Sequence, residues 1–198
     1  MNLLKKYIIT QFKTLKDNIE FSKIFNSPLC FCTSAFGETL TCILKNTKGS
    51  GTNGGGSFDT CTGDEVKTLM KLQSKKCTNC GYKNTFFSSS CHSCGHESFE
   101  YATDTRAGID SKSHFKYYNE LDEYIIVEIS PEVLNHNCRR FKLSVSKIKK
   151  DNKFFNSLLN VQKQSGTFNK NLLTTSVEYF MSCPCKMFTC VVDVEKDV

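Results

Sequence analysis

The chain has 198 residues, of which 39% are hydrophobic and 23% charged, a composition typical of one medium-sized globular domain or of a domain with a small appended module. No apolar run reaches the roughly 18 residues that a membrane-spanning helix needs, so the sequence predicts no membrane association. The net charge of +6 permits contact with nucleic acid or with an acidic protein, and it excludes neither partner.

The N-terminal part is predicted to contain two helices and one strand. Apolar residues recur with the helical period of 3.6 over residues 3–25, and the sequence Asn26-Ser27-Pro28 ends the pattern. Residues 39–44 are rich in β-branched side chains, which favours a short strand. Residues 64–74 begin with acidic groups and end near lysines, which is typical of a helix. The glycine-rich residues 49–57 are predicted to be a flexible loop.

The C-terminal part is predicted to be mostly strands, with one helix over residues 151–164. Strand-like runs cover residues 123–130, 141–148, 172–180 and 186–194. Strands that follow one another with few helices between them favour an antiparallel sheet. The sequence therefore predicts an α+β fold, with a mainly antiparallel sheet, an N-terminal amphipathic helix and an inserted four-cysteine ribbon.

The predicted organisation has four parts. They are an N-terminal helix and first strand over residues 1–48, the flexible loop 49–57, a helix plus the ribbon over residues 58–100, and an antiparallel α+β region over residues 101–198.

Cysteine usage points to metal binding. The chain has 12 cysteines, and residues 1–15 interleave lysines with apolar residues and have no continuous apolar segment. We therefore expect no secretion signal and an intracellular location, cytoplasmic or nuclear. In such a reducing compartment cysteines serve as metal ligands or free thiols more often than as disulfides.

Cys77, Cys80, Cys91 and Cys94 form two Cys-x-x-Cys pairs, each followed by a glycine. Each pair places two thiolates on one tight turn, at about the separation that two corners of a tetrahedral zinc site require. Four sulfur ligands leave no open coordination position. We therefore expect a structural Zn²⁺ and not a catalytic one.

Residues 77–95 resemble the zinc-ribbon family, in which two such turns sit on facing hairpins. This resemblance implies that the four cysteines are zinc ligands and that the exposed faces of the ribbon recognise nucleic acid or protein. The same residues are similar to zinc fingers of the Ran-binding-protein type, with Asn84 at the asparagine of that family. Members of that family bind single-stranded RNA or ubiquitin.

Residues 77–82, together with Arg140 and Phe141, are also similar to the fingers region of ubiquitin-specific proteases. Neither the cysteine box nor the histidine box of that family is visible in the sequence. The similarity therefore implies a non-catalytic relative.

Two further cysteine pairs are candidates for a second metal site. Each pair places two thiols one residue apart, and the pairs would make another four-sulfur site if the fold brought them together. Buried free thiols are the alternative interpretation. The candidate ligands are Cys30, Cys32, Cys183 and Cys185.

A basic segment over residues 139–150 contains no acidic residue and is the best candidate for contact with phosphates. A charged outer face exposed to water is the alternative. The candidate nucleic-acid-binding residues are Arg139, Arg140, Lys142, Lys147, Lys149 and Lys150, and the lysines around the ribbon are Lys75, Lys76 and Lys83.

Together these features predict a zinc-binding recognition protein whose partner is nucleic acid. The alternative is a protein-interaction module, either directed to ubiquitin or a subunit of an assembly. No nucleophile motif accompanies the histidines, so the sequence favours recognition over catalysis.

Overall fold

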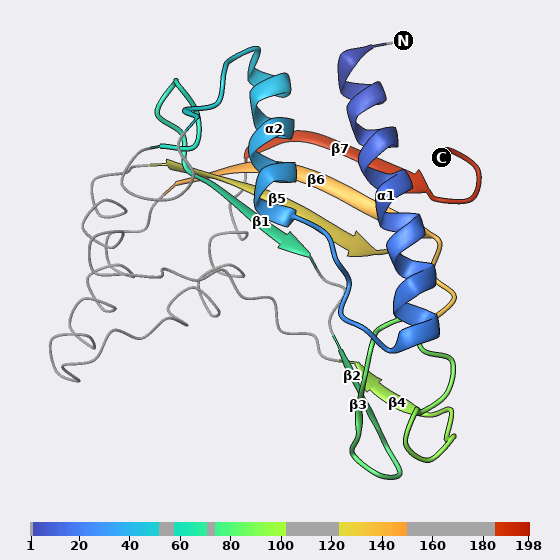
Figure 1. Cartoon of the computed structure of the whole chain (residues 1–198). Helices are drawn as coiled ribbons and strands as arrows, with labels where there is room; N and C mark the ends of the chain where they lie inside the picture. The colour runs from blue at the N-terminus through green and yellow to red at the C-terminus, as the bar shows by residue number, and fades with distance from the viewer. Residues whose placement is uncertain (1, 52–57, 71–73, 102–122, 150–184) are drawn as a thin grey trace, which may run out of the picture.

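In the computed structural model two helices cover one face of a four-stranded sheet, and a separate three-stranded sheet lies at one end (Figure 1). This confirms the predicted α+β class. The predicted helix 151–164 and strand 172–180 lie outside the described residues. The structure describes residues 2–51, 58–70, 74–101, 123–149 and 185–198.

Helix α1 (Leu3–Phe25) has the limits that its sequence predicts. The side-chain oxygen of Asn2 accepts a hydrogen bond from the N–H of Leu4 at 3.1 Å and caps the first turn. Asn26, with φ of 48°, ends the helix in the left-handed conformation. In the described part of the chain, no helix combines the length and the apolar character needed to cross a membrane. The buried apolar side chains of α1 are Ile8, Phe12, Leu15 and Ile19.

Helix α2 (Thr33–Lys45) occupies the place where we predicted a strand over residues 39–44, so that prediction is wrong. Phe36 and Leu40 lie one helical turn apart and are both buried against the sheet and α1. Burial of this helical face outweighs the weak strand preference of the β-branched residues around it.

Strand β1 (Val66–Met70) replaces the helix predicted over residues 64–74, which is also wrong. The acidic residues that suggested a helix start instead stabilise a turn. The carboxylate of Asp64 accepts hydrogen bonds from the hydroxyls of Thr60 at 2.7 Å and Thr62 at 2.6 Å. The carboxylate of Asp59 accepts one from the N–H of Val66 at 2.7 Å.

The large sheet has the strand order β1-β5-β6-β7. The strands β5 (Glu123–Pro131), β6 (Arg140–Lys149) and β7 (Cys185–Asp193) pair antiparallel and lie within a residue of their predicted limits. Strand β1 pairs parallel with β5, so the sheet is mixed although mainly antiparallel.

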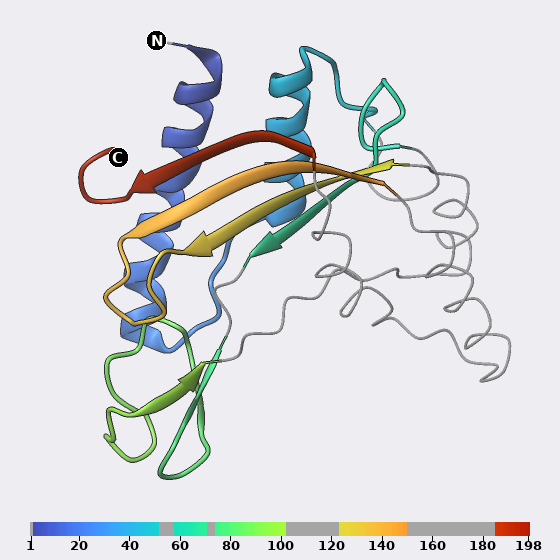
Figure 2. The ribbon, with the colours of Figure 1, turned by 180° about the vertical axis from the view of Figure 1, so that it is seen from behind.

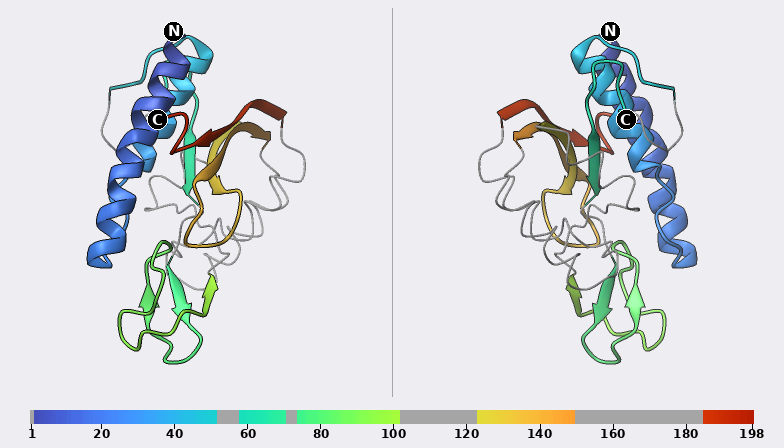
Figure 3. Two further views of the ribbon diagram at one scale, coloured as in Figure 1. Left: turned by 90° about the vertical axis from the view of Figure 1, so that its right-hand side faces the viewer. Right: turned by 90° about the vertical axis from the view of Figure 1, so that its left-hand side faces the viewer.

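The main core lies between this sheet and the two helices, which stand on the same side of it (Figure 3). Phe12 of α1 is fully buried, with its ring centroid 6.4 Å from that of Phe36 and 6.1 Å from that of Phe141. The three rings join α1, α2 and β6 directly.

The three-stranded sheet has the order β3-β2-β4, with β2 (Lys75–Cys77), β3 (Lys83–Asn84) and β4 (Phe99–Tyr101). It is the inserted ribbon that the sequence predicts. Phe86 and Phe87, between its two cysteine pairs, are buried and belong to the main core. The ribbon is therefore packed onto the rest of the protein.

Candidate metal centre

The two cysteine pairs lie on turns with the same backbone hydrogen bonds. The N–H of Cys77 donates to the carbonyl of Tyr82 at 3.0 Å, and the N–H of Gly81 donates to the carbonyl of Cys77 at 2.9 Å. The second turn repeats this pattern from Cys91, with 2.8 Å in both bonds. Gly81 and Gly95 both have φ of 72°, a left-handed conformation that glycine adopts without steric cost.

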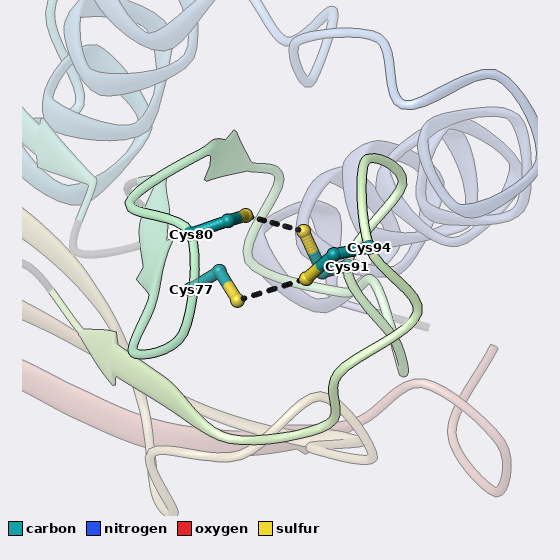
Figure 4. Close-up of side chains that lie close together, drawn as sticks. All are labelled: Cys77, Cys80, Cys91 and Cys94. Atoms are coloured by element: carbon teal, nitrogen blue, oxygen red, sulfur yellow. Dashed lines mark hydrogen bonds between the residues drawn. The ribbon is translucent and has the colours of Figure 1, made fainter.

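The four sulfur atoms face one another between these turns (Figure 4). The Sγ atoms of Cys77 and Cys94 lie 3.6 Å apart. Those of Cys80 and Cys91 lie 3.5 Å apart, and all four lie within 4.8 Å of one another. Sulfur atoms about 2.3 Å from a tetrahedral zinc ion are about 3.8 Å from each other, so these separations fit a metal ion at the centre.

The coordination shell of this site is closed, although the site lies at the protein surface. Cys77 and Cys91 are buried, whereas Cys80 and Cys94 are exposed. Four thiolates fill all four positions around a tetrahedral ion and leave none for water or substrate. The donor set suits an ion that stabilises the ribbon.

Hydrogen bonds to sulfur favour the thiolate form that a metal ligand adopts. Burial raises the pKa of Cys91, but hydrogen bonds from the backbone N–H groups of Cys94 and Ser93 and from the Asn84 amide outweigh it and lower the pKa to about 6. The pKa of Cys94 is also lowered, first by the backbone N–H of His96. Two of the four cysteines therefore lose their protons more readily than an ordinary thiol does.

Cys80 indicates why this cluster suits a cation. The backbone N–H of Tyr82 lowers the pKa of Cys80, but desolvation and the neighbouring thiols outweigh it and raise the pKa to about 11. Four thiols this close cannot all ionise unless a positive charge neutralises them. A divalent cation at the centre would supply that charge.

Asn84 connects the two turns. Its Oδ1 accepts a hydrogen bond from the N–H of His92 at 3.0 Å, and its Nδ2 donates to the carbonyl of Tyr82 at 3.0 Å. The same Nδ2 lies 3.6 Å from the Sγ of Cys91. Asn84 is 2% exposed, so its amide group is shielded from water.

We expect Asn84→Ala to weaken metal binding about tenfold to a hundredfold, because residues that orient metal ligands commonly have effects of that size. Competition with a chromophoric chelator would measure the affinity. Asn79→Ala is the matched control, since Asn79 is exposed and makes one contact to the site, at 3.7 Å to the Sγ of Cys94. Equal affinities for the wild type and Asn84→Ala would contradict the role given to Asn84.

Lys75 does not belong with the exposed lysines around the ribbon. It is 1% exposed, and its Nζ donates to the carbonyl of Ser88 and lies 3.9 Å from the ring centroid of Phe99. Burial lowers the pKa of Lys75 to about 8. This lysine contributes to packing inside the ribbon and cannot reach a phosphate, which corrects the expectation from sequence.

The predicted second metal site is not tested by the described residues. Cys30 and Cys32 lie just before α2, and Cys185 begins β7; all three are exposed. They lie outside the ribbon cluster, which is the one group of three or more potential metal ligands found among the described residues. Cys183 lies outside those residues, so the second site stays a prediction.

The basic segment begins at an exposed end of β6. Arg139 and Lys142 are exposed there. Arg140 is also exposed, but its guanidinium forms an ion pair with Glu132 at 3.2 Å and lies opposite Asp193 on β7. Arg140 is thus already next to carboxylates, whereas Arg139 and Lys142 form no ion pair within the described ranges.

The rest of the basic segment is divided between the two faces of the sheet. Lys147 lies opposite Ile125, which packs in the core on the helix side. Because side chains alternate along a strand, Lys142 lies on the other face. Lys149 is the last residue of β6, and Lys150 lies outside the described residues. The six residues therefore do not form one continuous surface within the described strand.

Comparisons with known proteins give no further assignment, since no family model, no curated protein and no solved structure matches the chain.

Proposed function

We propose that the protein binds Zn²⁺ at Cys77, Cys80, Cys91 and Cys94 as a structural ion, and that the ribbon it stabilises recognises nucleic acid. Zinc suits a tetrahedral shell of four sulfur atoms better than the hard cations that prefer oxygen. The equivalent hydrogen bonds of the two turns support the resemblance to zinc ribbons.

The observation that carries the nucleic-acid part is a pair of lysines on the ribbon. Lys76 and Lys83 lie directly opposite each other on β2 and β3, and both are exposed. Like charges in this position repel each other and destabilise a strand pair. Neither lysine forms an ion pair within the described residues, although Glu100 lies opposite Lys76 on its other side. An anionic ligand such as a phosphate backbone would relieve the repulsion.

Two cations at the start of β6 support the same proposal. The start of β6, with Arg139 before it and Lys142 within it, lies at the end of the molecule where the ribbon lies (Figure 1). The loop before β6 contacts the ribbon, because the backbone N–H of His136 faces the Tyr101 hydroxyl oxygen and partly offsets the rise in the pKa of Tyr101 that burial causes. Cations from both sheets would then face one strand of nucleic acid.

We expect the double variant Lys76→Ala, Lys83→Ala and the double variant Arg139→Ala, Lys142→Ala each to weaken nucleic-acid binding without sequence preference. Each phosphate contact contributes about 0.7 to 0.9 to the slope of log affinity against log salt concentration. Losing two contacts should therefore flatten the slope by about 1.5 units. Titration of a labelled single-stranded RNA and a labelled DNA duplex at several salt concentrations would measure this.

The matched control is Lys6→Ala, Lys13→Ala, which removes the same charge from the exposed surface of α1. It should leave the salt slope unchanged. If the control flattens the slope as much as the test variants do, the effect comes from net charge. If the wild type does not bind either probe at low salt, the nucleic-acid proposal is wrong and the protein-interaction alternative takes its place.

A further inference from the structure

The open edge of the large sheet is a second feature that suggests binding, distinct from the ribbon. Strand β7 is the last in the order β1-β5-β6-β7, and in the described ranges no strand pairs with its other edge (Figure 2). Its backbone groups on that edge lack strand partners within those ranges. Met187 and Val191 are 37% and 39% exposed, so the strand also presents apolar side chains. An edge of this kind readily accepts another strand.

A groove lies beside this edge, between β7 and the first turns of α1. Its volume is about 570 Å³, within the range of pockets that bind ligands. Cys190 behaves as an apolar group in this lining, because burial raises the pKa of its thiol and keeps it neutral. The apolar lining residues are Leu4, Ile8, Ile9, Phe188, Cys190, Val191 and Val192.

The charges that border this groove are predominantly positive. Lys5 and Lys196 line it, are exposed and form no ion pair with any residue that the structure describes. The carboxylate of Asp197 accepts a hydrogen bond from the N–H of Asp193 at 2.8 Å and so belongs to the C-terminal turn. Glu195 pairs with Lys16 at 3.8 Å. Two cations are thus available to an acidic partner.

We propose that the edge of β7 and this groove bind an extended segment of a partner protein as an added strand. The backbone of that segment would pair with β7, and its large apolar side chains at alternate positions would enter the groove. Acidic residues that flank the apolar ones would meet Lys5 and Lys196. Main-chain hydrogen bonds would provide affinity, and the groove would provide specificity, as in other cases of strand addition.

Other occupants fit these features less well. Two copies of this chain paired through β7 would bring Lys5 and Lys196 of both copies together, and like charges at an interface repel. In such a dimer the side chains of Phe188 and Cys190 would still line the groove of their own copy. They would not fill the groove of the other copy, so both grooves would stay empty. A lipid would fill the groove but could not pair with the backbone of β7.

The test is a display library of nine-residue peptides with apolar residues at alternate positions and a free choice of Asp, Glu, Lys or Ser between them. Selection on the full, zinc-loaded chain should enrich peptides with acidic residues near the ends. Binding of a selected peptide should slow hydrogen exchange of the β7 amides. No enrichment over the unselected pool, or no change in β7 exchange, would overturn the proposal.

Two variants test the groove and its charges separately. Lys5→Glu with Lys196→Glu, and separately Ile9→Arg, should each weaken a selected peptide about tenfold or more. The controls are Lys13→Glu on the same helix and Val133→Arg, since Val133 is an exposed apolar residue far along the chain from the groove. Equal affinity for the wild type and both groove variants would reject the site.

A second copy as the occupant is distinguished by sedimentation of the peptide-free protein. The proposal expects a monomer in which the β7 amides on the open edge exchange quickly, whereas those bonded to β6 are protected. A dimer at micromolar concentration whose open-edge β7 amides are already protected would replace the partner segment by self-association.

Discussion

Cys80→Ser should abolish stable metal binding and release the ribbon from its folded state. A serine hydroxyl is a poor ligand for zinc, and three sulfur atoms leave the shell incomplete. In small zinc modules the ion contributes on the order of 10 kcal/mol to folding, which exceeds what a short polar ribbon can supply otherwise. We expect metal analysis to find less than one ion per chain, and hydrogen exchange over residues 75–101 to become fast.

The large sheet should remain folded in this variant, because its core lies between the sheet and the two helices. Phe86 and Phe87 belong to that core, so their segment should keep more protection than the turns that hold the cysteines. Cys61→Ser is the matched control, since Cys61 is an exposed thiol outside the cluster. Unchanged metal content in Cys80→Ser, or equal loss in Cys61→Ser, would contradict the assignment of the four ligands.

The four-cysteine cluster could be predicted from sequence because its geometry is local. Each turn closes through hydrogen bonds between residues close in sequence, and a glycine follows each pair. The burial of Lys75 could not be predicted in this way. It depends on Phe99 and Tyr101 of β4, which follow the second cysteine pair and lie over the lysine Nζ at 3.9 Å and 5.3 Å.

Helices and strands could be predicted from sequence where the spacing of apolar residues within the segment itself indicates its type. The stripe of α1 and the alternation of β6 and β7 fix their type, since each buries one face. Strand β5 is instead recognisable as a short apolar run, and its residues 124–129 are buried on both faces. The two elements whose type was predicted wrongly, α2 and β1, contact each other. The local preferences of both segments are weak, and β1 pairs with a strand much later in the chain, so tertiary packing decides their type.

Gly37→Ala tests the contact between α2 and β1, and we expect it to destabilise the protein strongly. Alanine is the better helix former, so at an open position it would stabilise α2 by up to about 1 kcal/mol. At Gly37, however, an added Cβ would lie 1.8 Å from the Oγ1 of Thr68 on β1 and 3.4 Å from the Cβ of Val127. We therefore expect a loss of about 1–3 kcal/mol in the free energy of unfolding, measured by urea denaturation.

Thr68→Ala should restore much of this loss, because it removes the Oγ1 atom that an added Cβ would meet. That oxygen has no hydrogen-bond partner within the described residues, so its removal alone should cost little. The double variant should then show a coupling energy of about 1 kcal/mol or more between the two positions. Gly37→Ala combined with Thr10→Ala on the exposed side of α1 is the control and should be additive. If Gly37→Ala and Thr68→Ala are additive as well, Gly37 does not pack against Thr68, and α2 is held on the sheet in another way.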